Sequence, residues 1–265
     1  MNNQNKPLIT VITVCYNAVN ELEKTMLSVL NQTYDNIEYI IIDGGSKDGT
    51  VDIIKKYADR LAYWVSEPDK GIYDAMNKGI LAAKGEWINF MNAGDLFVKS
   101  TTLSEVFDTK QYSCDIIYGD TVKKLSLGTY LSKHEAVDTL NERLPFCHQS
   151  CFISQKVAMA NLYQLEYKIA ADYNQFYNIY KQGGKFTGVD VPISIFDNID
   201  GISSQYPARL INEYSMVNGK SAYPKLLKLI CFRFIKRILE LILPKKYYQL
   251  ILEKRKLKNI GERYE

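Results

Sequence analysis

Two aspartates follow apolar runs in the first part of the chain, at positions where a carboxylate could do chemistry. The apolar run 37–42 ends at Asp43, and the run 87–91 is followed by Asn92, two small residues and Asp95. Apolar runs of this length are typical of strands buried on both faces of a sheet. In open α/β sheets, ligands bind outside the carboxyl ends of such strands. We therefore expect Asp43 and Asp95 at one edge of one sheet, as the start of an active site.

The residues near Asp43 suit a planar base. Tyr16 and Asn17 follow the apolar run 8–15, which predicts a neighbouring strand. An aromatic ring can stack on a nucleobase, and a carboxylate can accept an N–H group, of which uracil has one. A turn in which Asp43 caps the following helix explains the same residues equally well.

The segment 92–95 offers oxygen ligands beside small residues. Such an arrangement leaves room for a hard cation and a diphosphate, because Mg²⁺ and Mn²⁺ take few protein oxygens and complete their shells with phosphate and water. The cation would neutralise charge on a departing diphosphate. An ordinary turn remains the alternative interpretation.

The elements that must position these residues alternate between strand and helix. This order predicts a parallel sheet with right-handed crossovers. The expected strands are 8–15, 37–42, 61–66 and 87–91, and the expected helices are 21–31, 50–57 and 74–83.

Beyond Asp95 the pattern loosens. We expect an irregular segment over 121–150 and a loop over 202–208, and no internal repeat is present. The remaining expected elements are helices at 101–107, 154–162 and 170–180, and strands at 115–118 and 188–196.

Size and cysteine usage bound the class of protein. The chain has 265 residues, 46% of them hydrophobic, which suffices for one large domain with an appendage. The short polar segment 1–6 predicts no signal peptide, and no apolar run reaches the length of a spanning helix. Five scattered cysteines predict reduced thiols in the cytoplasm. The cluster 147–151 (CHQSC) is too small for a zinc site, so we expect structural thiols there.

The positive charge is concentrated in the tail. Residues 220–258 hold twelve Lys/Arg against two Glu, a net charge of +10, while the remainder carries −7. Between Pro224 and Pro244 the polar residues recur at helical spacing among Leu, Ile and Phe, which predicts a basic amphipathic helix. It could pack on the domain, dimerise, or lie on an anionic membrane leaflet. The wide apolar face and the charge favour the membrane and argue against nucleic acid.

Several segments together resemble a family 2 glycosyltransferase with the GT-A nucleotide-sugar-binding fold. They are ITVITVCYN (9–17), SVLNQTYDNIEYIIIDGGSKDGT (28–50), GIYDAMNKGILAAKGEWINFMNAGD (71–95) and, more weakly, the neighbourhood of Asp172. The resemblance covers residues 8–100, is fainter over 101–205, and does not include the tail. It implies an α/β domain with a mainly parallel sheet and a C-terminal amphipathic helical extension.

The resemblance also implies roles for individual residues. Asp95 stands in the place of the family's Asp-x-Asp motif and would bind Mn²⁺ or Mg²⁺, although Asn92 and Gly94 depart from that motif. Asp172 would be the catalytic base, with Asp120 in reserve. Asp120, His148 and Gln149 would contact the acceptor, and a purely structural role for His148 stays open. The nucleotide-sugar-binding residues would be Val14, Tyr16, Asn17, Asp43, Gly45, Asn77, Lys78, Asn92, Gly94 and Asp95.

The implied activity is inverting transfer of a sugar from a UDP-sugar to a hydroxyl of a saccharide. Bacterial relatives often act on lipid-linked sugars, so the resemblance favours a lipid-linked acceptor and surface-polysaccharide (O-antigen or capsule) synthesis. We expect residues 1–100 to bind the nucleotide sugar, residues 101–219 to bind the acceptor, and residues 220–265 to form the tail. The enzyme would be peripheral on the inner face of the plasma membrane, bound through residues 224–258, with a homodimer left open.

Two other enzyme classes use similar residues. A nucleotidyltransferase also binds a nucleotide and a metal on an α/β sheet, but it would show a Gly-rich, basic N-terminal loop, which Cys15-Tyr16-Asn17 is not. A glycosidase needs a facing carboxylate pair, which the sequence does not single out.

Overall fold

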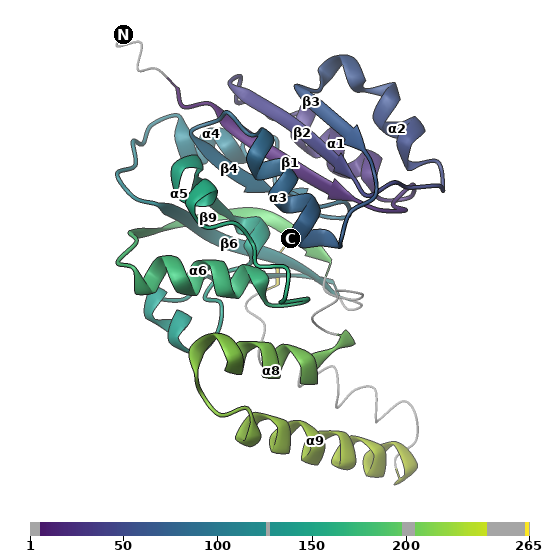
Figure 1. Cartoon of the computed structure of the whole chain (residues 1–265), viewed down its shortest axis with the longest axis vertical. Coiled ribbons are helices and arrows are strands. Elements are labelled where there is room, and N and C mark those ends of the chain that lie inside the picture. Colours follow the sequence, from purple (N-terminus) through teal and green to yellow (C-terminus); the bar gives the residue numbers. More distant parts are fainter. Residues whose placement is uncertain (1–5, 126–127, 198–204, 243–262, 265) are drawn as a thin grey trace.

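A computed structural model describes residues 6–125, 128–197, 205–242 and 263–264. Within these residues, one sheet runs through the molecule with helices on both faces (Figure 1). Its strand order is β3-β2-β1-β4-β8-β6-β9-β5, and β7 pairs with β6 outside this path. The fold is therefore mixed α/β, as expected.

The first half confirms the predicted alternation of strands and helices. The pairs β1–β2, β2–β3 and β1–β4 are parallel, so the carboxyl ends of these strands share one edge. The elements are β1 (Ile9–Cys15), α1 (Leu22–Leu30), β2 (Ile37–Asp43), α2 (Thr50–Lys56), the 3-10 turn η1 (Ala58–Arg60), β3 (Tyr63–Ser66), α3 (Ile72–Ala82) and β4 (Trp87–Phe90).

The second half is less regular and adds antiparallel pairs. Strand β8 lies antiparallel between β4 and β6, which joins the two halves into one sheet. The elements are β5 (Leu96–Phe97), α4 (Thr102–Phe107), β6 (Ile116–Leu125), β7 (Gly128–Ser132), the 3-10 turns η2 (Val137–Asn141) and η3 (His148–Ser150), β8 (Cys151–Ser154), α5 (Gln155–Ala160), α6 (Ala171–Lys181) and β9 (Phe186–Asp197).

Two predictions for the second half were wrong in part. The segment 121–150 is not all irregular, because β6 continues to Leu125 and forms a hairpin with β7, and η2 and η3 follow. The loop predicted over 202–208 falls partly outside the described residues, and Pro207 already begins α8 (Pro207–Asn218). Proline fits the first turn of a helix, where its missing N–H is not needed.

The core lies on both faces of the sheet because alternate residues of each strand point to opposite sides. On β1, Ile12 and Val14 join the cluster that packs under α3 and α6, while Ile9 and Val11 join the cluster under α1 and α4. Every residue of β1 is buried. This double burial explains why the first strands are continuous apolar runs.

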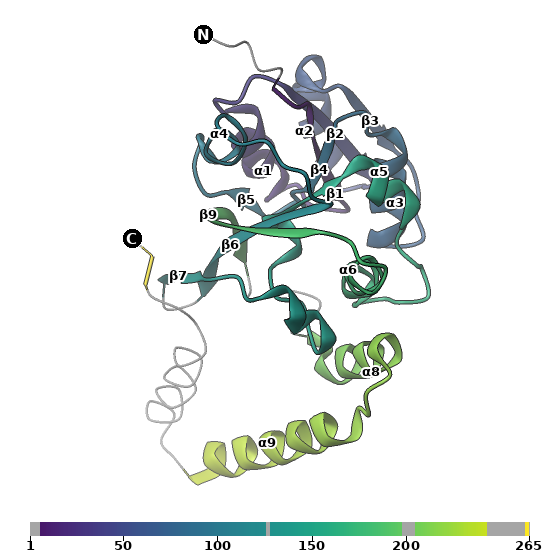
Figure 2. The same cartoon turned by 90° about the vertical axis from the view of Figure 1, so that its left-hand side faces the viewer.

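Two helices lie beyond the sheet domain. Helix α8 packs on α6, and α9 (Tyr223–Ile242) contacts α8. Figure 2 shows α9 beyond α8, on the side away from the sheet. Among the described residues, no helix is long and apolar enough to cross a membrane.

Candidate active site

The loop after β4 carries Asp95 and is fixed by α1. The backbone N–H of Gly94 donates to the Thr25 hydroxyl (3.0 Å), and that hydroxyl donates to the carbonyl of Asp95 (2.9 Å). The backbone N–H of Asp95 also donates to the Asn92 carbonyl (2.9 Å), which closes a tight turn. Gly94 has φ of 103°, a conformation that favours glycine. The turn therefore holds Asn92 and Asp95 at the carboxyl edge of the sheet, as predicted.

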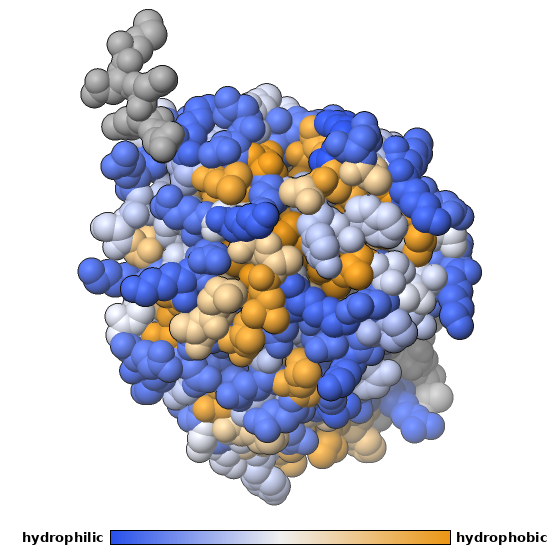
Figure 3. All heavy atoms as spheres, turned by 45° about the horizontal axis from the view of Figure 1, so that its top comes forward, coloured by the Kyte–Doolittle hydropathy of each residue, from blue (hydrophilic) through white to orange (hydrophobic). Residues whose placement is uncertain are grey.

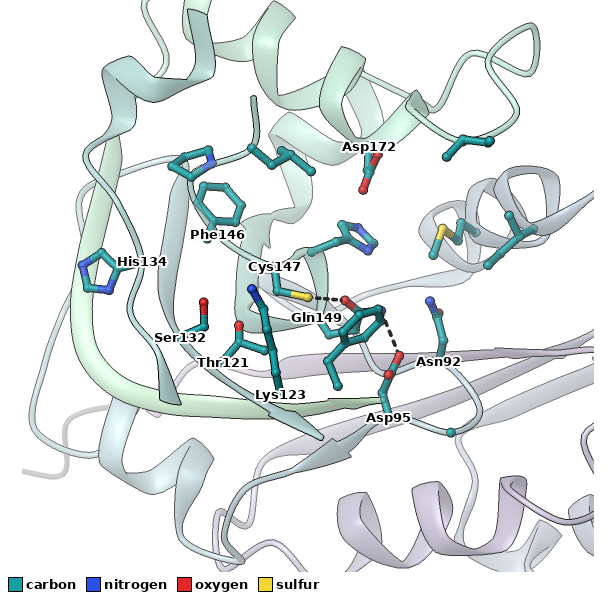
Figure 4. Close-up of a pocket in the computed structure, with 18 of the residues that line it drawn as sticks. Asn92, Asp95, Thr121, Lys123, Ser132, His134, Phe146, Cys147, Gln149 and Asp172 are labelled. Carbon is teal, nitrogen blue, oxygen red and sulfur yellow. Dashed lines mark hydrogen bonds between the residues drawn. The ribbon is translucent and has the colours of Figure 1, made fainter. Parts of the chain in front are cut away.

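A cavity of about 730 Å³ opens at this edge. Asn92, Gly94 and Asp95 line one side of it, and Asp172 faces them from the α6 side (Figure 4). Residues from β6 and β7 complete the wall, with Thr121, Lys123 and Ser132 among them. The structure thus brings the predicted diphosphate-binding acid and the predicted base to one cavity.

Asp172 lies in the first turn of α6, and its side chain is partly buried. One carboxylate oxygen accepts the backbone N–H of Tyr173 (2.7 Å). Burial raises the pKa of Asp172 to about 6, since an ionised carboxylate loses solvation there. A carboxylate with a pKa near 6 is ionised at neutral pH and remains basic enough to take a proton.

A hydrogen-bonded chain fixes the Asp95 carboxylate. The Gln149 side-chain N–H donates to Asp95 Oδ2 (2.8 Å), and the Cys147 thiol donates to Gln149 Oε1 (2.9 Å). Figure 4 shows this chain running along the cavity wall. Burial raises the pKa of Cys147 to about 12, so the thiol stays protonated and keeps donating. The sequence predicts Gln149 at the acceptor; the structure places it on the carboxylate predicted to face the diphosphate.

His148 also lines the cavity, but its ring is held by neighbours. Its Nε2 lies 2.7 Å from the Tyr163 hydroxyl, and the ring stacks on Phe90 with centroids 5.2 Å apart. Burial lowers the pKa of His148 to about 4, so the imidazole is neutral at physiological pH. These contacts agree with a structural role for His148, the alternative to acceptor binding.

Asp120 does not line the cavity. It is buried beside a β-bulge between β6 and β9, and its Oδ1 accepts the backbone N–H (2.9 Å) and contacts the ring Nδ1 (2.7 Å) of His134. His134 is the member of this pair that reaches the cavity wall. Asp120 therefore orders the segment after β7, and its carboxylate contacts a residue of the cavity wall, His134.

Asp43 is fully buried and holds the turn after β2. Its carboxylate accepts hydrogen bonds from the backbone and hydroxyl of Ser46 and from the hydroxyl of Ser66. Burial alone would raise the pKa of Asp43, but these hydrogen bonds hold it below the ordinary value. Asp43 is thus placed as a structural acceptor behind the turn, with no exposed oxygen.

Tyr16 and Asp69, an acid that the sequence analysis does not single out, lie beside the turn after β2. Tyr16 is 65% exposed. A Cβ on Gly44 would come within 2.5 Å of Asp69 Oδ2 and 3.3 Å of the Tyr16 ring, so all three meet at one corner. Asp69 follows β3, whose carboxyl end shares the edge of β1 and β2. The strand-end rule that singles out Asp43 would also have found Asp69.

The remaining residues predicted to bind the nucleotide sugar contact other parts of the protein or form its turns. Val14 is buried in the core. Asn17 accepts the backbone N–H of Lys47 (3.0 Å), and Gly45 has φ of 82° in the turn after β2. Asn77 pairs with both backbone groups of Tyr163, and Lys78 forms an ion pair with Glu67 (2.7 Å).

The residues around Asp95 suit a divalent cation whose remaining ligands come from phosphate and water. No group of three His, Cys, Asp or Glu comes together anywhere in the described part of the chain. Asn92 Oδ1, however, is buried without a hydrogen-bond partner, and Asn92 and Asp95 line the same side of the cavity. One carboxylate with one amide oxygen is a small donor set, which suits Mg²⁺ or Mn²⁺ when phosphate and water supply the other ligands.

Solved structures of similar fold are nucleotide-sugar enzymes of the GT-A class. TarS from S. aureus in complex with UDP-GlcNAc has a TM-score of 0.63 at 15% identity, covering 79% of this chain and 66% of that chain. The mannosyltransferase PcManGT from Pyrobaculum calidifontis, in complex with GDP-Man and Mn²⁺, also has a TM-score of 0.63, at 14% identity, covering 96% and 81%. These likenesses establish the fold: the protein has a GT-A glycosyltransferase architecture.

The family follows from the sequence comparison. Residues 10–171 match the model of glycosyl transferase family 2, which covers more than half of the chain, and the protein belongs to this family. A PGL/p-HBAD biosynthesis glycosyltransferase of Mycobacterium bovis is 29% identical over 63% of this chain and 68% of its own length. An uncharacterized glycosyltransferase of Mycobacterium tuberculosis is 34% identical over 63% and 66%. The protein is a glycosyltransferase, and this replaces the nucleotidyltransferase alternative.

Proposed function

We propose that the protein transfers a sugar from a UDP-sugar to a hydroxyl of a saccharide acceptor, with inversion at the anomeric carbon. The observation that carries this proposal is the pairing across one cavity of Asp95, at the strand ends, with Asp172, whose pKa is raised to about 6. The carboxylate of Asp95 would face the diphosphate of the donor, and the carboxylate of Asp172 would act as the base.

The reaction follows from this pairing as a single displacement. Asp172 takes the proton of the acceptor hydroxyl, the acceptor oxygen bonds to the anomeric carbon, and the bond from that carbon to the diphosphate oxygen breaks. General-base help of this kind is worth about 10²–10⁴-fold, and holding the two substrates in line contributes further. A divalent cation held by Asp95 and Asn92 would neutralise charge on the leaving diphosphate.

The nucleoside would bind in the corner made by Tyr16, Gly44 and Asp69. The exposed ring of Tyr16 offers a stacking surface, and the missing side chain at Gly44 lets Asp69 and the Tyr16 ring lie close to the backbone of the turn. Asp43 would support this corner from behind by fixing the turn. The complex of TarS with UDP-GlcNAc favours uracil, whereas PcManGT binds GDP-Man and makes a GDP-sugar the second candidate.

We further propose a lipid-linked saccharide as acceptor, in surface-polysaccharide synthesis at the inner face of the plasma membrane. The cavity wall near Asp172 includes Ile169 and, from α8, Leu210 and Tyr214. Such a wall suits an acceptor with an apolar part next to its reacting hydroxyl.

The test is a donor screen followed by one substitution. Purified protein is incubated with a panel of UDP- and GDP-sugars, with Mn²⁺ or with EDTA, and nucleotide release is followed by mass spectrometry. We expect one UDP-sugar to be hydrolysed slowly without acceptor, in a Mn²⁺-dependent way. Asp172→Asn should keep UDP binding by calorimetry and lose at least about 10²-fold in turnover. Turnover near the wild-type rate in Asp172→Asn would remove the base assignment.

A further inference from the structure

Helix α9 exposes an unusual share of apolar surface. Of the thirteen large hydrophobic side chains that are exposed among the described residues, six belong to its 20 residues. Elsewhere, on the face shown in Figure 3, hydrophobic residues are interspersed among hydrophilic ones. Contiguous apolar surface of this kind marks an interaction site in a folded protein.

The exposed residues form one stripe along α9. Tyr223, Leu227, Ile230 and Phe234 recur at spacings of four and three, and their exposed fractions are 71%, 47%, 63% and 66%. Residues at these spacings share one face of a helix. Ile235 and Ile242 widen the stripe at 53% and 72% exposure. We call these six residues the α9 apolar face.

Basic residues border the α9 apolar face on both sides. By the helical repeat, Arg233 and Arg237 fall along one border and Lys228 along the other. All three are exposed, and no ion pair holds them within the described part of the chain. Among residues 223–242, five are Lys or Arg and one is Glu. The apolar face therefore has exposed positive charge on both of its sides.

This face points away from the protein. A helix that packs on a globular domain turns its apolar stripe toward the core. Among the described side chains of α9, the half-buried ones are Leu226, Leu229, Phe232 and Leu239, which lie on a different side of the helix from the stripe. The contact with α8 thus leaves the α9 apolar face in solvent.

We infer that the α9 apolar face binds the surface of an anionic lipid bilayer, with the helix lying in the plane of the interface. Its apolar side chains would enter the acyl region, and Lys228, Arg233 and Arg237 would meet the headgroup phosphates. A second copy of the chain is a poorer occupant. A symmetric pair would bring the same basic borders together, whereas anionic headgroups neutralise them.

The experiment is co-sedimentation of the full chain with phosphatidylcholine vesicles, with and without phosphatidylglycerol. We expect binding that needs phosphatidylglycerol and weakens with salt. Ile230→Gln/Phe234→Gln should weaken it about a hundredfold, and Lys228→Gln/Arg233→Gln about thirtyfold. Because these side chains are exposed, neither double variant removes a core contact, and unfolding curves check that both remain folded. Vesicle binding is measured without sugar donor or acceptor, so this inference and the proposed activity can each fail alone.

Matched controls come from other parts of the surface. Leu81 on α3 is 60% exposed and lies outside α9, so Leu81→Gln should bind like the wild type. Lys55→Gln/Lys110→Gln removes two exposed charges elsewhere and should have little effect. Light scattering without vesicles should give a monomer. The inference would be overturned if the protein were a dimer that Ile230→Gln/Phe234→Gln dissociates. It would also be overturned if both α9 variants bound vesicles as well as the wild type does.

Discussion

At the scale of single residues, the environment of Asp172 is the feature with the clearest consequence. Its pKa is raised to about 6 because the carboxylate is buried, so the folded state holds a proton that the unfolded chain releases near pH 4. The stability that this proton contributes is therefore fully present below about pH 4 and is lost as the pH rises through about 6. The ionised form, which the proposed mechanism uses, is therefore the less stable one.

This dependence of stability on pH gives a prediction for Asp172→Asn. A shift of about two pKa units corresponds to about 3 kcal/mol, so the variant should be more stable than the wild type at pH 7 by up to about that amount. The gain should vanish at about pH 4, where the wild-type carboxyl is protonated in the folded state. Urea unfolding at the two pH values measures the difference. The wild-type transfer rate should fall as the pH drops below about 6, and an equal gain at both pH values would contradict burial of the carboxylate as the cause.

The link from Gln149 to Asp95 gives a second residue-scale prediction. Gln149→Ala removes the donor that fixes Asp95 Oδ2, so it should lower turnover about tenfold or more and raise the Mn²⁺ concentration needed for half-maximal activity. Gln182→Ala is the control, because Gln182 is exposed at the end of α6, outside the cavity lining. If Gln149 instead contacts the acceptor, acceptor KM should rise while the Mn²⁺ requirement stays the same.

The positions of candidate site residues were predictable from sequence where strand ends and helix starts decide them, and their roles stay predictions. Asp95 and Asp172 reach the cavity because a strand end and a helix start put them there. The surroundings of Asp43 and Asn77 depend on partners far away in the chain, such as Ser66 and the backbone of Tyr163. Other wall residues, such as Cys147 and Lys123, join the cavity through tertiary packing, for which the sequence carries no local signal.

At the scale of elements, α8 positions the helix that carries Asp172. The carboxylate of Glu213 is buried and accepts the backbone N–H groups of Lys168, Ile169 and Ala170 at 2.9–3.2 Å. These groups lie just before the start of α6, which begins at Ala171. A negative charge at a helix start also favours the helix through its dipole. Glu213 thus acts as a cap supplied by another helix.

Glu213→Gln is the test at this scale. The amide keeps the size of the side chain but removes its charge. Its NH₂ group would also face backbone N–H groups that now donate to a carboxylate oxygen. The substitution should therefore destabilise the protein by about 1–3 kcal/mol. The nearby negative charge also contributes to the raised pKa of Asp172, so the pH at which activity is half lost should move downward. Glu166→Gln on the exposed segment before α6 serves as the control. An unchanged pH profile with normal stability would show that Glu213 does not support Asp172.

The elements themselves were predictable where periodicity is long. The alternation of β1 to β4 with three helices follows from continuous apolar runs and amphipathic stretches. Strand β8 was missed because it has four residues and its pairing with β4 and β6 is set by tertiary contacts. The β6–β7 hairpin was missed because Lys123 and Lys124 interrupt the apolar pattern.

At the scale of the whole molecule, one sheet crosses both halves of the catalytic unit. The predicted division at residues 100 and 219 separates binding roles and stays a prediction, whereas the pairing of β4 with β8 makes the two halves structurally continuous. The tail prediction holds for the amphipathic helix α9, and its part over 243–262 falls outside the described residues. The side toward which α9 turns its apolar face could not be derived from periodicity alone.

The junction between α8 and α9 has a consequence for how such a protein can diverge. Helix α8 ends at Asn218 and is followed by Gly219, which has φ of 69°. Glu213 and Asn218 make their hydrogen bonds to the α6 region before that glycine. The family match ends at residue 171, but the support of Asp172 extends to the end of α8. Substitutions on the exposed face of α9 can therefore accumulate without removing the contacts of Glu213 and Asn218, while Arg263 and Tyr264 pair with β7 and hold the far end of the chain on the sheet.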